Sequence, residues 1–324
     1  MWRGLALVVV TAGCGRISFD PRFDATATDA IDASAFACPF GFVPITGNFA
    51  LGTKDFCAMR FEAKAWVDTD GDLAVDPSEV DADGCDDACA VCDDTCLVSW
   101  QIGERTAVAV PAGVPWRNAT QLHALGMCRE LGAGYDLMAN REWMTIARDA
   151  ELVGANWSGG APGVGRVVEG NTDVTDTVFA VSDPTNSYSD TGNSAADPAD
   201  TGWEQRRTLE LSNGSVIWDV PGNMQEWIDW TLGDPLDGPP SCTDGELPAI
   251  SCPGLAYDDF NSTTGTYDRT TGVGYLIGGM GDALRRGGQT TDRQFGIAGI
   301  YALNMNRFTT QTFPATGFRC VYRF

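Results

Sequence analysis

Histidine is almost absent from this sequence: His123 is the only one in 324 residues. A catalytic triad uses one imidazole and a histidine-ligated zinc site uses others, so one histidine cannot serve both. The sequence also lacks the Gly-x-Ser-x-Gly motif of serine hydrolases. His123 itself is expected to be an ordinary helix residue.

Positive charge is also scarce, with 21 Lys and Arg against 44 Asp and Glu and a formal net charge of -23. Nucleic-acid binding depends on cationic side chains that neutralise phosphates, so no nucleic-acid partner is expected. No apolar run is long enough to span a bilayer.

The N-terminus has the organisation of an export signal. A basic start with Arg3 precedes the apolar run Leu5–Val10, and small residues lead to Cys14. This resembles a bacterial lipoprotein signal, which implies a signal peptide over residues 1–13, a lipid on Cys14 and an extracytoplasmic position, in the outer membrane. Residues 14–37 repeat Asp, Ala and Thr and are expected to form a disordered tether, with the lipid as the only membrane contact. Ordinary secretion is the alternative.

Ten cysteines remain besides Cys14, an even number that favours disulfides in an oxidising compartment. Cys38 and Cys57 bracket two strand-like runs, which predicts a stapled hairpin. Cys242 and Cys252 most simply close their own loop. The remaining four cysteines are close together in sequence. Two local disulfides are favoured for them over a zinc or iron–sulfur site, and they are Cys85, Cys89, Cys92 and Cys96.

Residues 38–324 are predicted to form one large α+β domain, because the sequence is 44% hydrophobic yet contains 38 Gly. One helix is expected from an Asn118 cap to Gly132, and a second after an Asn140 cap with Trp143 in the core. The Asn213-Gly214 turn predicts a hairpin between residues 207–211 and 216–220.

Residues 66–98 are predicted to form an insertion that is rich in Asp and Cys. Its carboxylates have the spacing of a calcium-binding loop and are Asp68, Asp70, Asp72, Asp76 and Glu79. Leu73 stands where such a loop needs glycine. The alternatives are structural calcium and a solvated acidic loop.

Three stretches carry a family resemblance: the Glu142-Trp143 pair, the segment Gly222–Trp227, and a C-terminal core that begins at Arg286-Gly287-Gly288 and ends at Gly317-Phe318-Arg319-Cys320. They resemble the formylglycine-generating enzyme (sulfatase-modifying factor) family, a variant of the C-type-lectin fold. The resemblance implies two main helices, twisted antiparallel strands and many long loops. It also implies a Cys128–Cys320 disulfide and structural calcium on Asn223 and Glu226.

The catalysts of that family carry two further cysteines after the double glycine, which bind copper. Residues 291–297 contain no sulfur here, and Cu(I) is selected by thiolates, so copper is not expected. The sequence therefore predicts a non-catalytic cell-envelope binding protein for a protein or glycan ligand. The alternatives are a formylglycine-generating or related enzyme and an inert envelope lipoprotein.

The predicted ligand-binding residues mix hydrogen-bonding and aromatic side chains near the C-terminus. This arrangement also resembles ligand-binding proteins that are diversified by retroelements. The residues are Gln289, Thr291, Asp292, Arg293, Phe295, Tyr301, Asn304 and Asn306.

Overall fold

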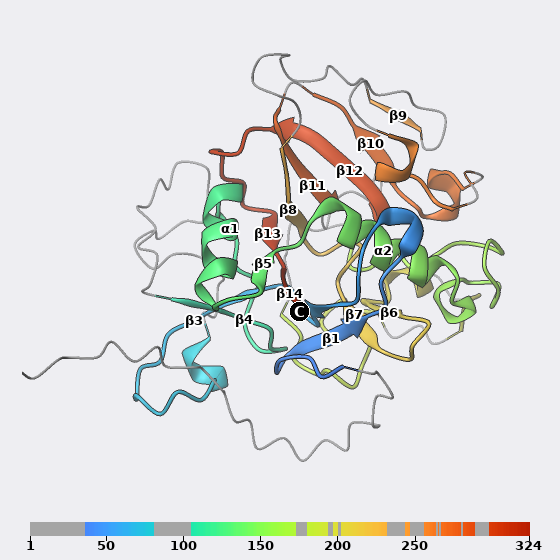
Figure 1. The fold of residues 1–324 in the computed structure, drawn as a ribbon. Coiled ribbons are helices and arrows are strands. Elements are labelled where there is room, and N and C mark those ends of the chain that lie inside the picture. The colour runs from blue at the N-terminus through green and yellow to red at the C-terminus, as the bar shows by residue number, and fades with distance from the viewer. Residues whose placement is uncertain are drawn as a thin grey trace, which may run out of the picture.

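The chain folds into an α+β domain in which two helices pack against several small sheets (Figure 1). The computed structural model describes residues 36–80, 105–172, 180–193, 197–199, 202–231, 244–246, 256–263, 265, 267–279, 281–288 and 298–324. The predicted lipidation site Cys14, residues 14–35 of the predicted tether and the cysteines at 85, 89, 92, 96, 242 and 252 lie outside these ranges. Within them, no helix is both long and apolar enough to cross a membrane.

A four-stranded antiparallel sheet joins the two ends of the domain. Its strands are β1 (Phe42–Ile45), β2 (Phe56–Met59), β5 (Tyr135–Leu137) and β14 (Cys320–Arg323), in the order β1-β2-β14-β5. The β1–β2 hairpin was predicted, and the Cys38–Cys57 disulfide that staples it is confirmed, with 5.7 Å between the Cα atoms.

A six-stranded sheet, in the order β13-β8-β11-β12-β10-β9, forms the other large layer. Its strands are β8 (Gln225–Thr231), β9 (Gly245–Glu246), β10 (Tyr275–Ile277), β11 (Ala283–Gly287), β12 (Gly299–Arg307) and β13 (Thr316–Phe318). The expectation of antiparallel strands was too simple, because β10 pairs with β12 and β13 pairs with β8 in parallel.

Two further antiparallel pairs lie among the described residues, and the second of them is a hairpin. They are β3 (Lys64–Trp66) with β4 (Thr106–Val108), and β6 (Thr208–Glu210) with β7 (Val216–Trp218). The β6–β7 hairpin confirms the turn predicted at Asn213-Gly214, where Gly214 has a φ of +87°. The short 3₁₀ helices are η1 (Phe49–Leu51), η2 (Pro77–Glu79), η3 (Gly154–Asn156), η4 (Trp203–Gln205), η5 (Tyr257–Asp259) and η6 (Arg269–Thr271).

Helix α1 (Gln121–Glu130) begins two residues later than predicted. Asn118 cannot be its cap because it is left-handed, with a φ of +61°, whereas an N-cap is extended. Thr120 caps the helix instead, and its Oγ1 accepts from the His123 N–H at 3.1 Å.

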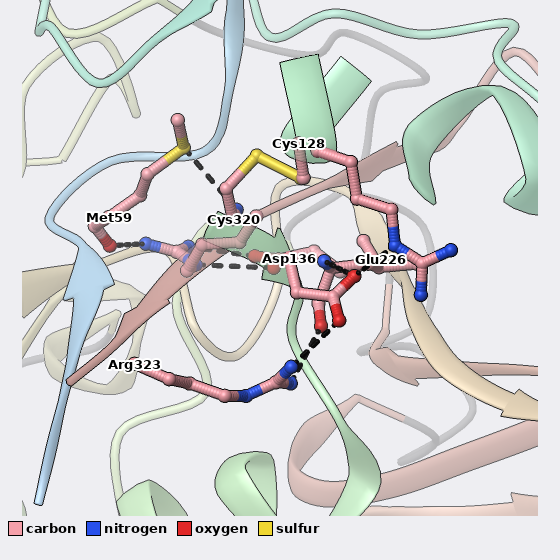
Figure 2. The surroundings of a disulfide bond; sticks show 9 residues. Met59, Cys128, Asp136, Glu226, Cys320 and Arg323 are labelled. Atoms are coloured by element: carbon pink, nitrogen blue, oxygen red, sulfur yellow. Dashed lines mark hydrogen bonds and ion pairs between the residues drawn. A yellow bond between two sulfur atoms is a disulfide. The ribbon is translucent and has the colours of Figure 1, made fainter. Parts of the chain in front are cut away.

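The Cys128–Cys320 disulfide joins α1 to β14 across 192 residues and confirms the predicted pairing (Figure 2). The Cys320 N–H points at the Met59 sulfur, 3.4 Å away, so β2 also packs at this bridge.

Helix α2 (Asn140–Glu151) is capped by Ala139 and not by Asn140. The Glu142 carboxylate accepts the Ala139 N–H at 2.7 Å, which satisfies the helix start. The Asn140 side chain is instead an acceptor for Arg286. The buried face is as predicted, since Trp143, Ile146, Ala147 and Ala150 are all fully buried.

Candidate functional sites

The two residues predicted to bind calcium from the family resemblance lie in the interior. Asn223 ends the loop before β8 with a φ of +58°, and Glu226 lies on β8. Arg319 faces Glu226 across the strands and donates to both of its carboxylate oxygens, at 2.7 and 3.2 Å. The Asn223 Oδ1 atom accepts from Asn171 Nδ2 at 2.9 Å, and its Nδ2 donates to Glu62 Oε2 at 2.6 Å.

A second buried ion pair lies beside the first. Arg207 on the loop before β6 donates two hydrogen bonds to Asp219, at 2.8 and 2.7 Å. Glu62 and Lys64 reach the same region, and the charges of Asp219 and Glu226 both act on Glu62. We call this group the buried charge cluster; it consists of Glu62, Lys64, Arg207, Asp219, Glu226 and Arg319, each at most 1% exposed.

Three carboxylates and three cations make the cluster formally neutral. Removal of charges from water costs several kcal/mol per ion unless each is paired, and the two bidentate arginine pairs provide that pairing. A calcium ion on Glu226 would therefore compete with the Arg319 guanidinium. Calcium at Asn223 and Glu226 stays a prediction.

Glu62 and Lys64 are not paired in this way. Burial raises the pKa of the Glu62 carboxyl to about 8, with Asp219 adding to the shift. Burial also lowers the pKa of the Lys64 amine to about 8, although Glu62 opposes this. Neither Lys64 Nζ nor Glu62 Oε1 has a hydrogen-bond partner among the described residues.

The acidic loop, Asp68–Glu79, is the second candidate site. Carboxylate oxygens of Asp68, Asp70 and Glu79 all lie within 4.8 Å of one another, which is a spacing that one cation can bridge. Asp72 and Asp76 were predicted ligands too, but they are not part of this group. Leu73 adopts the left-handed conformation, with a φ of +62°, at the position where a calcium loop needs glycine.

Glu79 is also held by the protein itself. It accepts from the Thr69 N–H and Oγ1, both at 2.7 Å, and from Trp66 Nε1 at 3.0 Å. The Thr69 hydroxyl and N–H, followed by the indole, lower the pKa of Glu79 to about 2. The carboxylate is therefore ionised across the physiological range.

The third candidate site is a polar pocket on the six-stranded sheet. Its cavity has a volume of about 10 Å³ and is lined by Gln225, Tyr275, Ile277, Arg285, Arg286, Gly288, Ala302, Leu303 and Asn304. Ligand pockets for drug-sized molecules are larger, roughly 300–1,000 Å³. This cavity has room for about one water molecule or one small polar group of a larger ligand.

Arg285 lines the polar pocket, and neighbouring side chains hold its guanidinium in place. It donates to Thr316 Oγ1 at 3.1 Å and to Asn306 Oδ1 at 2.5 Å, and it lies over the rings of Trp227 and Phe313. Beside it, Asn304 Nδ2 and Gln225 Oε1 are 3.4 Å apart, a long contact that a ligand can replace. The pocket therefore combines a positioned cation with two amide groups.

Only part of the predicted binding surface coincides with this pocket. Asn304 lines it and Asn306 is an exposed residue that holds Arg285. Tyr301 does not belong to any open surface, because it is fully buried and its hydroxyl donates to Glu151 at 2.5 Å. The remaining predicted residues lie outside the described part of the chain: Gln289, Thr291, Asp292, Arg293 and Phe295.

Sequence reasoning missed Gln225, Tyr275, Glu62 and Lys64. The last two had a detectable signal, since Glu62-Ala63-Lys64-Ala65 alternates charged with small residues at strand spacing. That pattern reads as a solvated strand face, and only the tertiary structure shows the charged side turned inward.

Comparisons with known proteins find distant similarity among solved structures. No protein-family model matches the chain, and no curated protein matches it. Among solved structures it is similar to one titled "Major Tropism Determinant P3c Variant", with 14% sequence identity and a TM-score of 0.35. The similarity covers 94% of this chain and 55% of that one, so this chain spans little more than half of that protein's length.

Proposed function

We propose that this chain is a non-catalytic binding protein of the cell envelope, built on a formylglycine-generating-enzyme variant of the C-type-lectin fold. The Cys128–Cys320 bridge between the first helix and the last strand supports the proposed fold. The sequence supports the absence of copper chemistry, because it has no cysteine between Cys252 and Cys320.

The observation that carries the proposed function is the polar pocket. Arg285, Gln225 and Asn304 supply a cation and two amides on rigid strands, and the apolar residues Ile277 and Leu303 complete the wall. Preorganised polar groups beside apolar surface give orientation and specificity to a bound ligand. The expected ligand is a protein or glycan outside the cytoplasm that inserts one polar group here.

A test begins with the purified chain on protein and glycan arrays, followed by titration of the best hit. Asn304→Leu is expected to weaken binding about tenfold or more, because a hydrogen-bonding site that loses its partner typically costs 1–3 kcal/mol. Thr310→Val, an exposed polar-to-apolar change elsewhere on the C-terminal segment, is the matched control. Equal binding by both variants, or oxidation of a cysteine peptide by the copper-loaded chain, would overturn the proposal.

The acidic loop supports a second function, calcium binding that stabilises the domain. Three carboxylates within 4.8 Å repel one another unless a cation lies between them. The pKa of Asp70 shows this repulsion. The hydrogen bond from the Asp72 N–H lowers that pKa, but desolvation and the charges of Asp72 and Glu79 outweigh the hydrogen bond, so the pKa is raised overall.

A further inference from the structure

We propose that the outer face of the four-stranded sheet is a lipid-contacting surface, which lies against the bilayer that the predicted lipid on Cys14 enters. The inference deepens the proposed function and rests on its envelope location. It adds a second membrane contact to the one expected from the lipid. The residues that carry it form what we call the aromatic row: Phe36, Phe42, Tyr135, Tyr322 and Phe324.

The five rings of the aromatic row follow one another at contact distance. The ring centroids of Phe36 and Phe324 are 4.9 Å apart, and those of Phe324 and Tyr322 are 5.3 Å apart. The Tyr322 and Tyr135 rings are separated by 4.9 Å, and the Tyr135 and Phe42 rings by 5.6 Å. These distances are typical of interacting aromatic pairs. Three segments that are far apart in the sequence therefore join into one continuous row of rings.

Strand register puts the aromatic row on one face of the sheet. Tyr322 lies opposite Cys57 in one ladder and opposite Tyr135 in the other, so these side chains share a face. Pro44 also lies opposite Cys57, and Phe42 is two residues earlier on the same strand. The other face is the inner one, because its side chains are buried in the core with those of α2: Val43, Ile45, Ala58 and Val321.

The outer face is partly open and poor in charge. Phe324 is 65% exposed, and the other four rings are half-buried. Residues 36–42 and 131–135 contain no charged side chain, in a chain with 44 Asp and Glu. Arg323 alternates with the aromatic residues of β14, and its guanidinium pairs with Glu142 on α2. A surface with few charges loses little hydration when it enters the headgroup region of a bilayer.

The first described residues lie on this same face. Cys38 is bonded to Cys57, and the Phe36 ring contacts Phe324, so the start of the domain runs over the outer side of the sheet. Figure 1 marks the C-terminus beside β1 and β14, in the same region. Residues 14–35 separate this point from Cys14. A flexible chain of about 22 residues spans roughly 25 Å, so a lipid on Cys14 would hold the domain near the bilayer by this face.

A bilayer is the partner that fits these observations. Tyrosine is enriched at membrane–water interfaces, because its ring is apolar and its hydroxyl reaches water. The net charge of -23 offers no attraction to anionic headgroups, so apolar contact has to provide the affinity. A contact that is weak for a free domain becomes effective here, because a short tether raises the local concentration of the bilayer around the domain.

Photolabelling of the full-length chain in vesicles tests the inference. The chain is produced in bacteria, the lipid on Cys14 is verified by mass, and the vesicles contain phosphatidylethanolamine, phosphatidylglycerol and a phospholipid with a diazirine at headgroup level. After digestion, fragment spectra locate each adduct. Adducts are expected within residues 36–42 and 322–324. None is expected at Phe49, which is 99% exposed but belongs to η1, where the Leu51 carbonyl accepts from Arg141 on α2.

Two results would contradict the lipid contact. One is an aromatic row without adducts; if the solubilised chain is then dimeric by light scattering, a second copy covers the face instead. The other is equal labelling of Phe49 and the aromatic row, because it shows that the domain has no fixed orientation on the bilayer.

Variants separate the aromatic row from general hydrophobicity. The double change Phe36→Ser and Phe324→Ser is expected to lower the adduct yield within residues 36–42 about tenfold or more, because two apolar rings no longer leave water. Phe49→Ser is the matched control and should leave the yield unchanged. Equal yields for both variants and the wild-type chain would refute the inference. Thermal unfolding reports the folding of each variant, and the wild-type adduct map decides the question if the double variant does not fold.

The same samples distinguish this inference from the proposed function. Asn304→Leu should weaken ligand binding on the arrays and leave the lipid adducts in place, because Asn304 belongs to the polar pocket. Loss of adducts with intact array binding would refute the lipid contact alone. A wild-type chain that carries no lipid on Cys14 would also refute the lipid contact, whereas ligand binding at the polar pocket would still be measured on the arrays.

Discussion

The buried charge cluster and the acidic loop both gather carboxylates, but they balance the negative charge differently. In the cluster, Arg207 and Arg319 lie against Asp219 and Glu226, and all four side chains are removed from water. In the acidic loop, no described arginine or lysine pairs with Asp68, Asp70 or Glu79, which face solvent more openly.

This difference follows from the cost of desolvation. A buried carboxylate needs a cation built into the chain, because water cannot stabilise it. Water partly stabilises a group of exposed carboxylates, so their negative charge can be balanced by a cation bound from solution. Three perturbations should distinguish the buried charge cluster from the acidic loop.

The largest effect is expected from Arg319→Ala. The change leaves Glu226 charged and buried with no cation, which typically costs about 3–5 kcal/mol of unfolding free energy. Urea unfolding measures the loss. Arg129→Ala is the control, because the exposed Arg129–Asp136 pair should contribute less than about 1 kcal/mol. Similar losses for the two variants would contradict the contrast.

Calcium should act on the acidic loop and not on the cluster. At a concentration about 100-fold above its dissociation constant, bound calcium raises the unfolding free energy by about 2.7 kcal/mol. Calcium-dependent thermal shifts measure this effect, which Asp70→Asn should remove and Glu226→Gln should leave in place. If Glu226→Gln removes the shift and Asp70→Asn does not, the ion belongs beside Asn223.

The smallest effect concerns the pH dependence of Glu79. Its folded pKa of about 2 lies below the ordinary value of 4.5, because Thr69 and Trp66 donate to the charged form. The stabilisation is therefore fully present above pH 4.5 and is lost as the pH falls toward 2. Carboxyl NMR in calcium-free buffer should give a midpoint near 2 for Glu79, and Thr69→Val should move it upward. A midpoint near 4.5 in the wild-type chain would show that the loop does not hold this carboxylate.

Local patterns predicted much of the fold. The Asn213-Gly214 hairpin and the apolar face of α2 depend on residues close in sequence, so their signals are readable. The helix caps were wrong because Asn118 is turned into a left-handed conformation and Asn140 is recruited by Arg286, a residue 146 positions away.

The candidate sites were predicted less well, because their residues come from parts of the sequence that are far apart. Asn304 was found because it belongs to the polar C-terminal segment, but the pocket also needs Gln225 and Tyr275, which the sheet topology brings to it. The inward orientation of Glu62 and Lys64 depends on the pairing of β3 with β4 and on charges from distant parts of the chain such as Asp219, which strand periodicity does not contain.

The position of β14 has a consequence for biosynthesis. The last strand of the chain lies between β2 and β5, and its Cys320 closes the bridge to Cys128 (Figures 1 and 2). A polypeptide that emerges N-terminus first therefore cannot complete this sheet until residues 320–323 have left the ribosome. A chain that stops before Gly317 leaves β2 and β5 without the strand that pairs with both, and it leaves Cys128 without Cys320.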